Sequence, residues 1–157
     1  MATAKAGLSG QVSMVLRDKQ GFIKEERSGP NTVTDAGITE VVKHMAGIAA
    51  DAWTHIAIGT DDTGEAVTDT TLGAEISTNG GARDASTVTA ETENTTGDTL
   101  QLISGWNFSG SLSINESGVF NAGSNGDMLC RQTFTTLTVG DGDSLTITWR
   151  ITLNQAA

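Results

Sequence analysis

The sequence is poor in the residues that usually build sites for chemistry. Its 157 residues include one cysteine, two histidines, no tyrosine and no apolar run near the ~18 residues needed to cross a bilayer. A single cysteine excludes an intrachain disulfide, and two histidines leave a zinc site dependent on carboxylates from distant loops. The N-terminal stretch lacks the apolar run of a signal peptide. We therefore expect no enzyme activity, no cofactor, no metal site and no membrane span.

Aromatic residues are also few: three tryptophans and four phenylalanines in the whole chain. So few large apolar side chains build a thin core, and a protein with a thin core gains stability from partners. We expect a homo-oligomer, a dimer or trimer, or a place in a larger assembly.

Positive charge is scarce and unevenly placed. Nine bases stand against nineteen acids, for a net charge of −10. Residues 1–50 hold six bases and five acids and sum to +1, whereas residues 51–157 hold three bases and fourteen acids and sum to −11. So acidic a body repels nucleic acid and anionic membranes. We expect the near-neutral N-terminal third to dock on a partner; the alternative is that the charge serves solubility alone.

The first fifty residues suggest an arm, a hairpin and one helix. Residues 1–10 are small and polar and are typical of a flexible arm. Residues 11–27 alternate around a turn at 18–21 and predict a hairpin. A helix over 35–49, capped by Thr34 or Asp35, would carry one apolar stripe, made of Ile38, Val41, Val42, Met45 and Ile48.

The pattern after Trp53 is that of β-strands separated by Gly, Asn and Asp turns. Strands are expected around Ile56 and Ile58, over 87–92, 100–108, 111–120 and 128–139, and over 144–153, where apolar residues alternate from Leu145 to Leu153. The sequence thus predicts a mainly β protein: one antiparallel β-sandwich domain of jelly-roll type over 11–157, with one short helix. Its expected core contains Ile38, Val41, Val42, Met45, Trp53, Ile56, Ile58, Leu145, Ile147, Trp149 and Ile151.

Few residues are candidates for chemistry. The acids of 61–69 and of 141–143 offer oxygen ligands for calcium, but Asp and Gly are also the residues that turns require. His44 lies beside the helix stripe, His55 is expected to point outward, and Cys130 lies in a predicted strand without a nearby base. Turn geometry, packing and an inert thiol explain these residues without a site.

Three groups of segments resemble one family pattern. They are residues 31–37 (NTVTDAG), 56–60 (IAIGT) with 68–76 (TDTTLGAEI), and 114–120 (INESGVF) with 128–134 (MLCRQTF) and 143–149 (DSLTITW). In this order they resemble small virion proteins of tailed bacteriophages, of the kind described as head decoration (cement) or tail-associated proteins. The segment 114–120 is also similar to pieces of tail-fibre and collar proteins. The resemblance implies no catalytic residue.

The resemblance implies a capsid decoration protein that binds the major capsid protein in a virion assembled in the host cytoplasm. Alternatives are a tail or tail-fibre-base component that contacts tail proteins, and a glycan- or calcium-dependent surface-binding module. No nucleic acid or membrane partner is expected. From the charge distribution, the expected contacts with the shell lie in the arm and the hairpin: Met1, Ala2, Thr3, Lys5, Arg17, Lys19 and Lys24.

Overall fold

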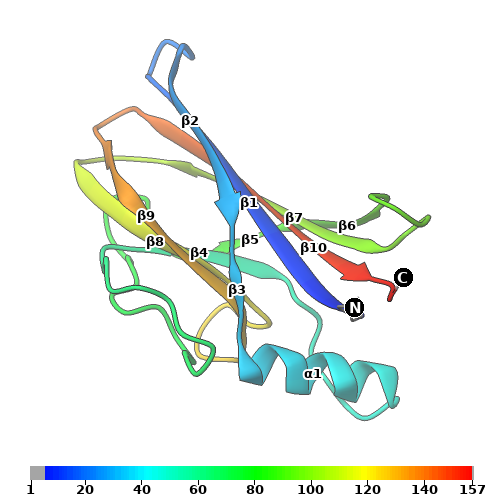
Figure 1. Cartoon of the computed structure of the whole chain (residues 1–157). Helices are drawn as coiled ribbons and strands as arrows, with labels where there is room; N and C mark the ends of the chain where they lie inside the picture. Colours follow the sequence, from blue (N-terminus) through cyan, green and yellow to red (C-terminus); the bar gives the residue numbers. More distant parts are fainter. Residues whose placement is uncertain (1–5, 157) are drawn as a thin grey trace.

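Residues 6–156 are described by a computed structural model, in which two five-stranded antiparallel sheets face each other (Figure 1). The first sheet has the order β2 (Ile23–Pro30), β1 (Gly7–Arg17), β10 (Ser144–Asn154), β7 (Thr99–Asn107) and β6 (Thr87–Glu91). The second has the order β3 (Thr32–Val33), β9 (Met128–Val139), β8 (Leu112–Phe120), β4 (His55–Gly59) and β5 (Asp84–Ala85). The prediction of a mainly β antiparallel sandwich with one helix is confirmed.

The strands follow the alternation in the sequence closely. The predicted hairpin is β1 and β2, and β6, β7, β8, β9 and β10 coincide with predicted strands to within a residue or two. The two-residue strands β3 and β5 are too short to leave a pattern. Hairpins join β1 to β2, β6 to β7 and β8 to β9, whereas β10 pairs with β1 and β7, which are far from it in the sequence.

The predicted arm ends earlier than expected. Gly7 to Gly10 belong to β1, in register with Asn154 to Ile151 of β10, so the boundary at residue 10 is wrong. Backbone pairing with β10 supplies the order that these small side chains do not. The rest of the predicted arm, residues 1–5, lies outside the described residues.

The core between the sheets confirms seven of the eleven predicted core residues. Each of the seven is at most 7% exposed: Trp53, Ile56, Ile58, Leu145, Ile147, Trp149 and Ile151. Trp149 also donates from Nε1 to Ser117 Oγ at 3.2 Å, so the one polar atom of this buried side chain is satisfied.

The helix α1 (Asp35–Met45) begins where predicted and ends earlier. Thr34 is the N-cap, and its Oγ1 accepts from the Gly37 amide at 2.9 Å. The helix stops at Ala46, followed by Gly47 at a φ of +66°, where glycine is the residue without steric cost. The predicted continuation to residue 49 is therefore wrong.

The orientation of α1 overturns part of the predicted core. Ile38, Val42 and Met45 are 44%, 56% and 78% exposed, and Val41 alone of the four predicted helix positions packs against the core. The helix instead rests on the sheet through Gly37 and Glu40. A Cβ at Gly37 would lie 2.6 Å from the Leu129 carbonyl oxygen, so the missing side chain lets the helix approach β9 and turns the apolar stripe outward.

Candidate functional site

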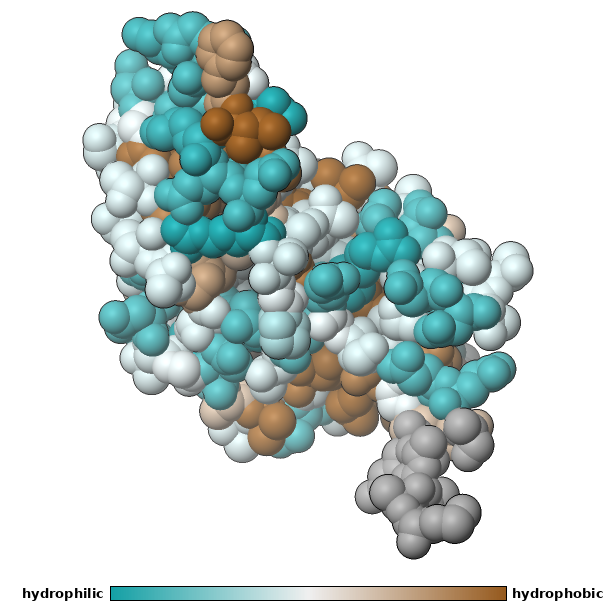
Figure 2. Space-filling model, turned by 45° about the horizontal axis from the view of Figure 1, so that its top comes forward, coloured by the Kyte–Doolittle hydropathy of each residue, from teal (hydrophilic) through white to brown (hydrophobic). Residues whose placement is uncertain are grey.

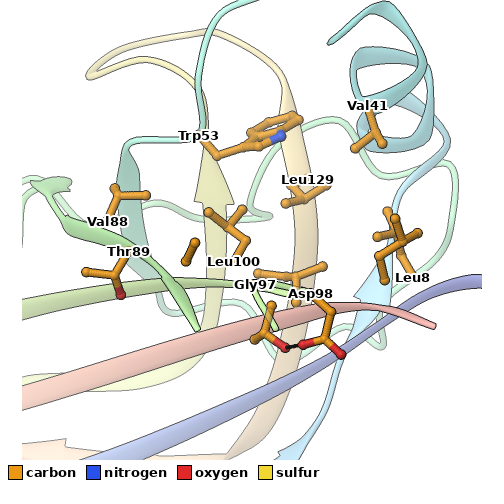
Figure 3. Close-up of a pocket in the computed structure, with 13 residues that line it drawn as sticks. Leu8, Val41, Trp53, Val88, Thr89, Gly97, Asp98, Leu100 and Leu129 are labelled. Carbon is orange, nitrogen blue, oxygen red and sulfur yellow. Dashed lines mark hydrogen bonds between the residues drawn. The ribbon is translucent and has the colours of Figure 1, made fainter. Parts of the chain in front are cut away.

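The sandwich is open at the end where β1 begins. A cleft of about 480 Å³ lies there between the inner face of the first sheet and the helix side of the molecule. Figure 3 shows Trp53, Leu129 and Val41 on one side of this space, with Leu8 and Leu100 on the other. We call it the end cleft; it is lined by Leu8, Val41, Trp53, Val88, Thr89, Ala90, Gly97, Asp98, Thr99, Leu100, Leu129, Ile151 and Leu153.

The end cleft exists because the first sheet continues past its partner. Leu8 pairs with Leu153, and Leu100 pairs with Ile151, on the face that forms the core further along the strands. Leu153 occupies the next inward position after Ile151 but is 52% exposed. The apolar alternation of the last strand therefore continues one position beyond the buried core, since α1 and Trp53, rather than a further strand, stand opposite Leu153.

The rim of the end cleft carries a fixed negative charge. The Asp98 carboxylate accepts backbone N–H groups of Thr95 and Glu93 at 2.8 Å and of Asn94 at 2.9 Å. These hydrogen bonds, with one from Thr99 Oγ1, hold the pKa of Asp98 far below its ordinary value. Asp98 thus stays ionised and holds the loop 93–98 in place.

The outward side of the helix is a second apolar surface. We call the side chains of Ile38, Val42, Met45 and Ile48 the apolar helix face; each is between 44% and 78% exposed. Exposed apolar side chains that gather on one side of a helix mark a candidate interaction surface. Brown, apolar residues gather at this lower end of the molecule in Figure 2.

A third apolar feature is the tip of the β1–β2 hairpin, at the opposite end of the molecule (Figures 1 and 2). Phe22 is 72% exposed and Ile23 is 49% exposed. Asp18 Oδ1 accepts the backbone N–H groups of Gln20 at 2.9 Å and Phe22 at 3.0 Å. The turn is therefore ordered although its apolar side chains face solvent.

Three of the seven predicted contact residues belong to the described part of the chain. Arg17, Lys19 and Lys24 lie at the hairpin tip, and Lys24 pairs with Asp143 at 2.6 Å. The eleven residues of β1 separate this tip from the N-terminal end of the strand by roughly 35 Å at the usual rise per residue. Met1, Ala2, Thr3 and Lys5 lie outside the described residues, so their contacts stay a prediction.

A buried ion cluster fastens the acidic loop that follows β4. The Arg131 side chain is 4% exposed and Glu116 is fully buried. Arg131 donates to Glu116 at 2.9 Å, to Asp69 at 2.9 Å and to Asp61 at 3.2 Å. Glu116 also accepts the amides of Gly73 and Ala74, at 3.0 and 2.8 Å, so both ends of the loop are held by one pair of side chains.

The electrostatics of this cluster follow from its contacts. Burial alone would lower the pKa of Arg131, but hydrogen bonds to Glu116 and Asp69 outweigh it and raise that pKa. Burial would raise the pKa of Glu65, but bonds from the Thr133 hydroxyl and amide outweigh it and lower that pKa. In the loop predicted to offer calcium ligands, the guanidinium of Arg131 thus supplies the positive charge that faces Asp61 and Asp69.

The remaining candidates for chemistry lie apart from one another. Cys130 is fully buried, and burial raises the pKa of its thiol well above the ordinary value, which keeps it protonated and inert. His44 bonds the Glu40 carbonyl of its own helix, and His55 bonds the Thr54 hydroxyl. Within residues 6–156, no three metal-ligating side chains are placed to share an ion. Likewise, no helix in this described part has the length and apolarity to cross a bilayer.

Sequence reasoning missed the end cleft, the ion cluster and the exposed tip. Phe22 and Ile23 follow the turn directly, and two large apolar residues at a hairpin tip are a signal that could have been noticed. The cluster leaves no local signal, because its members come from β8, β9 and the loop after β4.

Neither a protein-family model nor a curated protein matches this chain. The resemblance to phage virion proteins therefore stays a prediction.

Proposed function

We propose that this protein is a structural component of a tailed-bacteriophage virion, a decoration protein that binds the capsid lattice. The observation that carries the proposal is the apolar helix face: four half-exposed to largely exposed apolar side chains on an acidic, threonine-rich sandwich. The resemblance of residues 31–153 to small phage virion proteins supports the view that the partner is another virion protein.

The helix is well placed to be the docking element. It lies in the part of the chain that sums to +1, whereas residues 51–157 sum to −11. The helix itself carries Asp35, Glu40 and Lys43, a sum of −1, and Lys43 pairs with Glu40. A partner surface can thus approach the helix with less repulsion than an approach across the acidic body would meet, and a helix laid into a groove buries its apolar positions together.

A repeated shell favours this kind of binder. Many identical sites on the major capsid protein would each take one helix, and any link between bound copies would strengthen attachment without new contacts to the shell. The acidic sandwich would face outward and keep the particles apart by charge repulsion.

Substitutions on α1 test the proposal directly. Capsids assembled without this protein would be incubated with the whole chain and sedimented, and bound protein measured. The double variant Val42→Glu, Met45→Glu is expected to bind at least ~100-fold more weakly, because docking would strip water from two carboxylates. Thr39→Glu adds one carboxylate, half the charge of the double variant, at an exposed position of the same helix, outside the apolar helix face, and is expected to bind normally.

Two outcomes would contradict this assignment. Undiminished binding by the double variant would exclude the apolar helix face as the docking surface. A copy number of a few to dozens per particle, rather than hundreds, would place the protein in the tail or fibre base. Removal of residues 1–5 alone, which leaves β1 intact, tests the expected role of the arm.

Calorimetry covers the remaining alternative, a glycan- or calcium-dependent module. Heat on addition of calcium or glycans would favour that class. The contacts of Asp61 and Asp69 with Arg131 favour the structural role.

A further inference from the structure

The two ends of the sandwich carry complementary apolar features. The hairpin tip presents Phe22 and Ile23 to solvent, and the end cleft presents an apolar hollow at the far end of β1. We infer that the hairpin tip of one copy inserts into the end cleft of a second copy, so that the protein associates head to tail.

The sizes are compatible. The end cleft has a volume of about 480 Å³, and a cavity of roughly 150 Å³ already accepts a benzene ring. It therefore has room for the Phe22 ring together with the Ile23 side chain. Nine of its thirteen lining residues are apolar, with Leu8, Val88 and Leu153 at accessible positions, and burial against a phenyl ring removes their surface from water.

The tip is organised before any contact is made. Asp18 accepts two backbone amides of the turn, and Arg17 donates to the Gly21 carbonyl at 3.0 Å. Gly21 has a φ of +89°, which closes the turn without steric cost. A side chain held on a fixed turn loses less conformational freedom on binding than one on a loose loop.

The charges around the two features are of opposite sign. Residues 17–24 hold three bases and one acid, a sum of +2, and residues 91–98 beside the end cleft hold three acids and no base, a sum of −3. Asp143 pairs with Lys24 and Arg150 pairs with Glu93, which leaves sums of +1 at the tip and −2 beside the end cleft. Asp98, on the rim, accepts hydrogen bonds from backbone amides of its own loop and keeps its negative charge.

A second copy is the occupant that these observations favour. A contact between different patches of two copies is heterologous, so each copy offers one free tip and one free cleft, and the chain of contacts closes into a ring or continues as a filament. The contact uses neither Val42 nor Met45. The failure of this inference and the failure of the capsid proposal are therefore distinguishable.

Two substitutions remove one half of the contact each. Phe22→Ser removes the ring from the tip, and Leu153→Arg places a charge at the mouth of the end cleft. Both side chains are more than half exposed, so both variants are expected to unfold at the wild-type temperature. Val67→Arg is the matched control: Val67 is also 52% exposed and belongs to neither feature.

Sedimentation velocity over a concentration series reaching roughly 1 mM, where weak specific contacts become occupied, supplies the readout. Wild type and Val67→Arg are expected to form species larger than dimers at the upper concentrations. Each of the other two variants is expected to stay monomeric alone. An equal mixture of them is expected to form a one-to-one dimer, because one intact tip and one intact cleft remain.

Other outcomes overturn the inference. A wild type that stays monomeric throughout the series excludes the contact. Association of Phe22→Ser or of Leu153→Arg alone at the wild-type level shows that copies meet elsewhere. Loss of association in Val67→Arg, or a mixture that stays monomeric, excludes the pairing of tip with cleft.

Discussion

Replacement of Arg131 by Met should destabilise the protein by about 3 kcal/mol, near the low end of the 3–5 kcal/mol typical when one partner of a buried ion pair is lost. Glu116 is fully buried and would remain without its cation. Two features keep the loss moderate: the amides of Gly73 and Ala74 still bond the carboxylate, and Asp61 and Asp69 are about one quarter exposed, so water reaches them.

Urea unfolding at 25 °C, followed by the fluorescence of the buried tryptophans, measures this loss. For a domain of this size, each kcal/mol shifts the melting temperature by roughly 2–4 °C, so calorimetry should show a fall of about 6–12 °C. The control is Arg150→Met. Its partner Glu93 is 57% exposed, and an exposed pair contributes less than about 1 kcal/mol.

A result within 1 kcal/mol of wild type for Arg131→Met would refute this reasoning. It would mean that Glu116 takes up a proton or gains water at little cost, and that the cluster does not hold the loop. Amide exchange separates the two parts of the claim, because the Gly73 and Ala74 amides should exchange faster in Glu116→Gln even if global stability changes little.

Three further predictions concern the core, the packing of the helix against β9, and the dependence of stability on pH. Trp149→Asp should prevent folding, seen as loss of near-UV circular dichroism, whereas Thr148→Asp should fold; a folded Trp149→Asp would contradict the core. Gly37→Ala should lower the free energy of unfolding, measured in urea, by about 1–2 kcal/mol, because its Cβ would lie 2.6 Å from the β9 backbone. This cost outweighs the ~1 kcal/mol that alanine gains in helix propensity. A stabilised variant would contradict the close approach of the helix to β9. A hydrogen bond from Lys24 lowers the pKa of Asp143, so the stability that this carboxylate contributes is complete above pH 3.8 and is lost as pH falls through its lowered folded-state value. Lys24→Met should therefore be slightly less stable than wild type at pH 7, by less than about 1 kcal/mol. In acid unfolding curves this difference should shrink as pH falls through the lowered pKa of Asp143.

The strands and caps were predictable because their signals are local. The alternation from Leu145 to Ile151 identified β10 and its buried face, and the two candidate caps Thr34 and Asp35 located the start of the helix, where the structure has Thr34 as the cap. These features depend on residues a few positions apart, whose side-chain directions are set by the period of the backbone.

The helix shows where local signals fail. Its periodicity correctly located an apolar stripe, but all of the stripe except Val41 faces solvent, because a periodicity reports which residues share a face and not what that face meets. Gly37 and Glu40 decide the packing, because the close approach at Gly37 depends on Leu129, a residue far away in the sequence. The stripe is accordingly the surface on which the proposed function depends.

Local chemistry was enough to predict strands, turns, the cap and the sandwich class. Contacts between distant segments decided the rest. They determine which helix face is covered, where the first sheet extends beyond the second, and which acids from separate parts of the chain pair with Arg131. Burial and ion pairing depend on what the fold brings opposite each side chain, and that becomes defined only when the two sheets pack together.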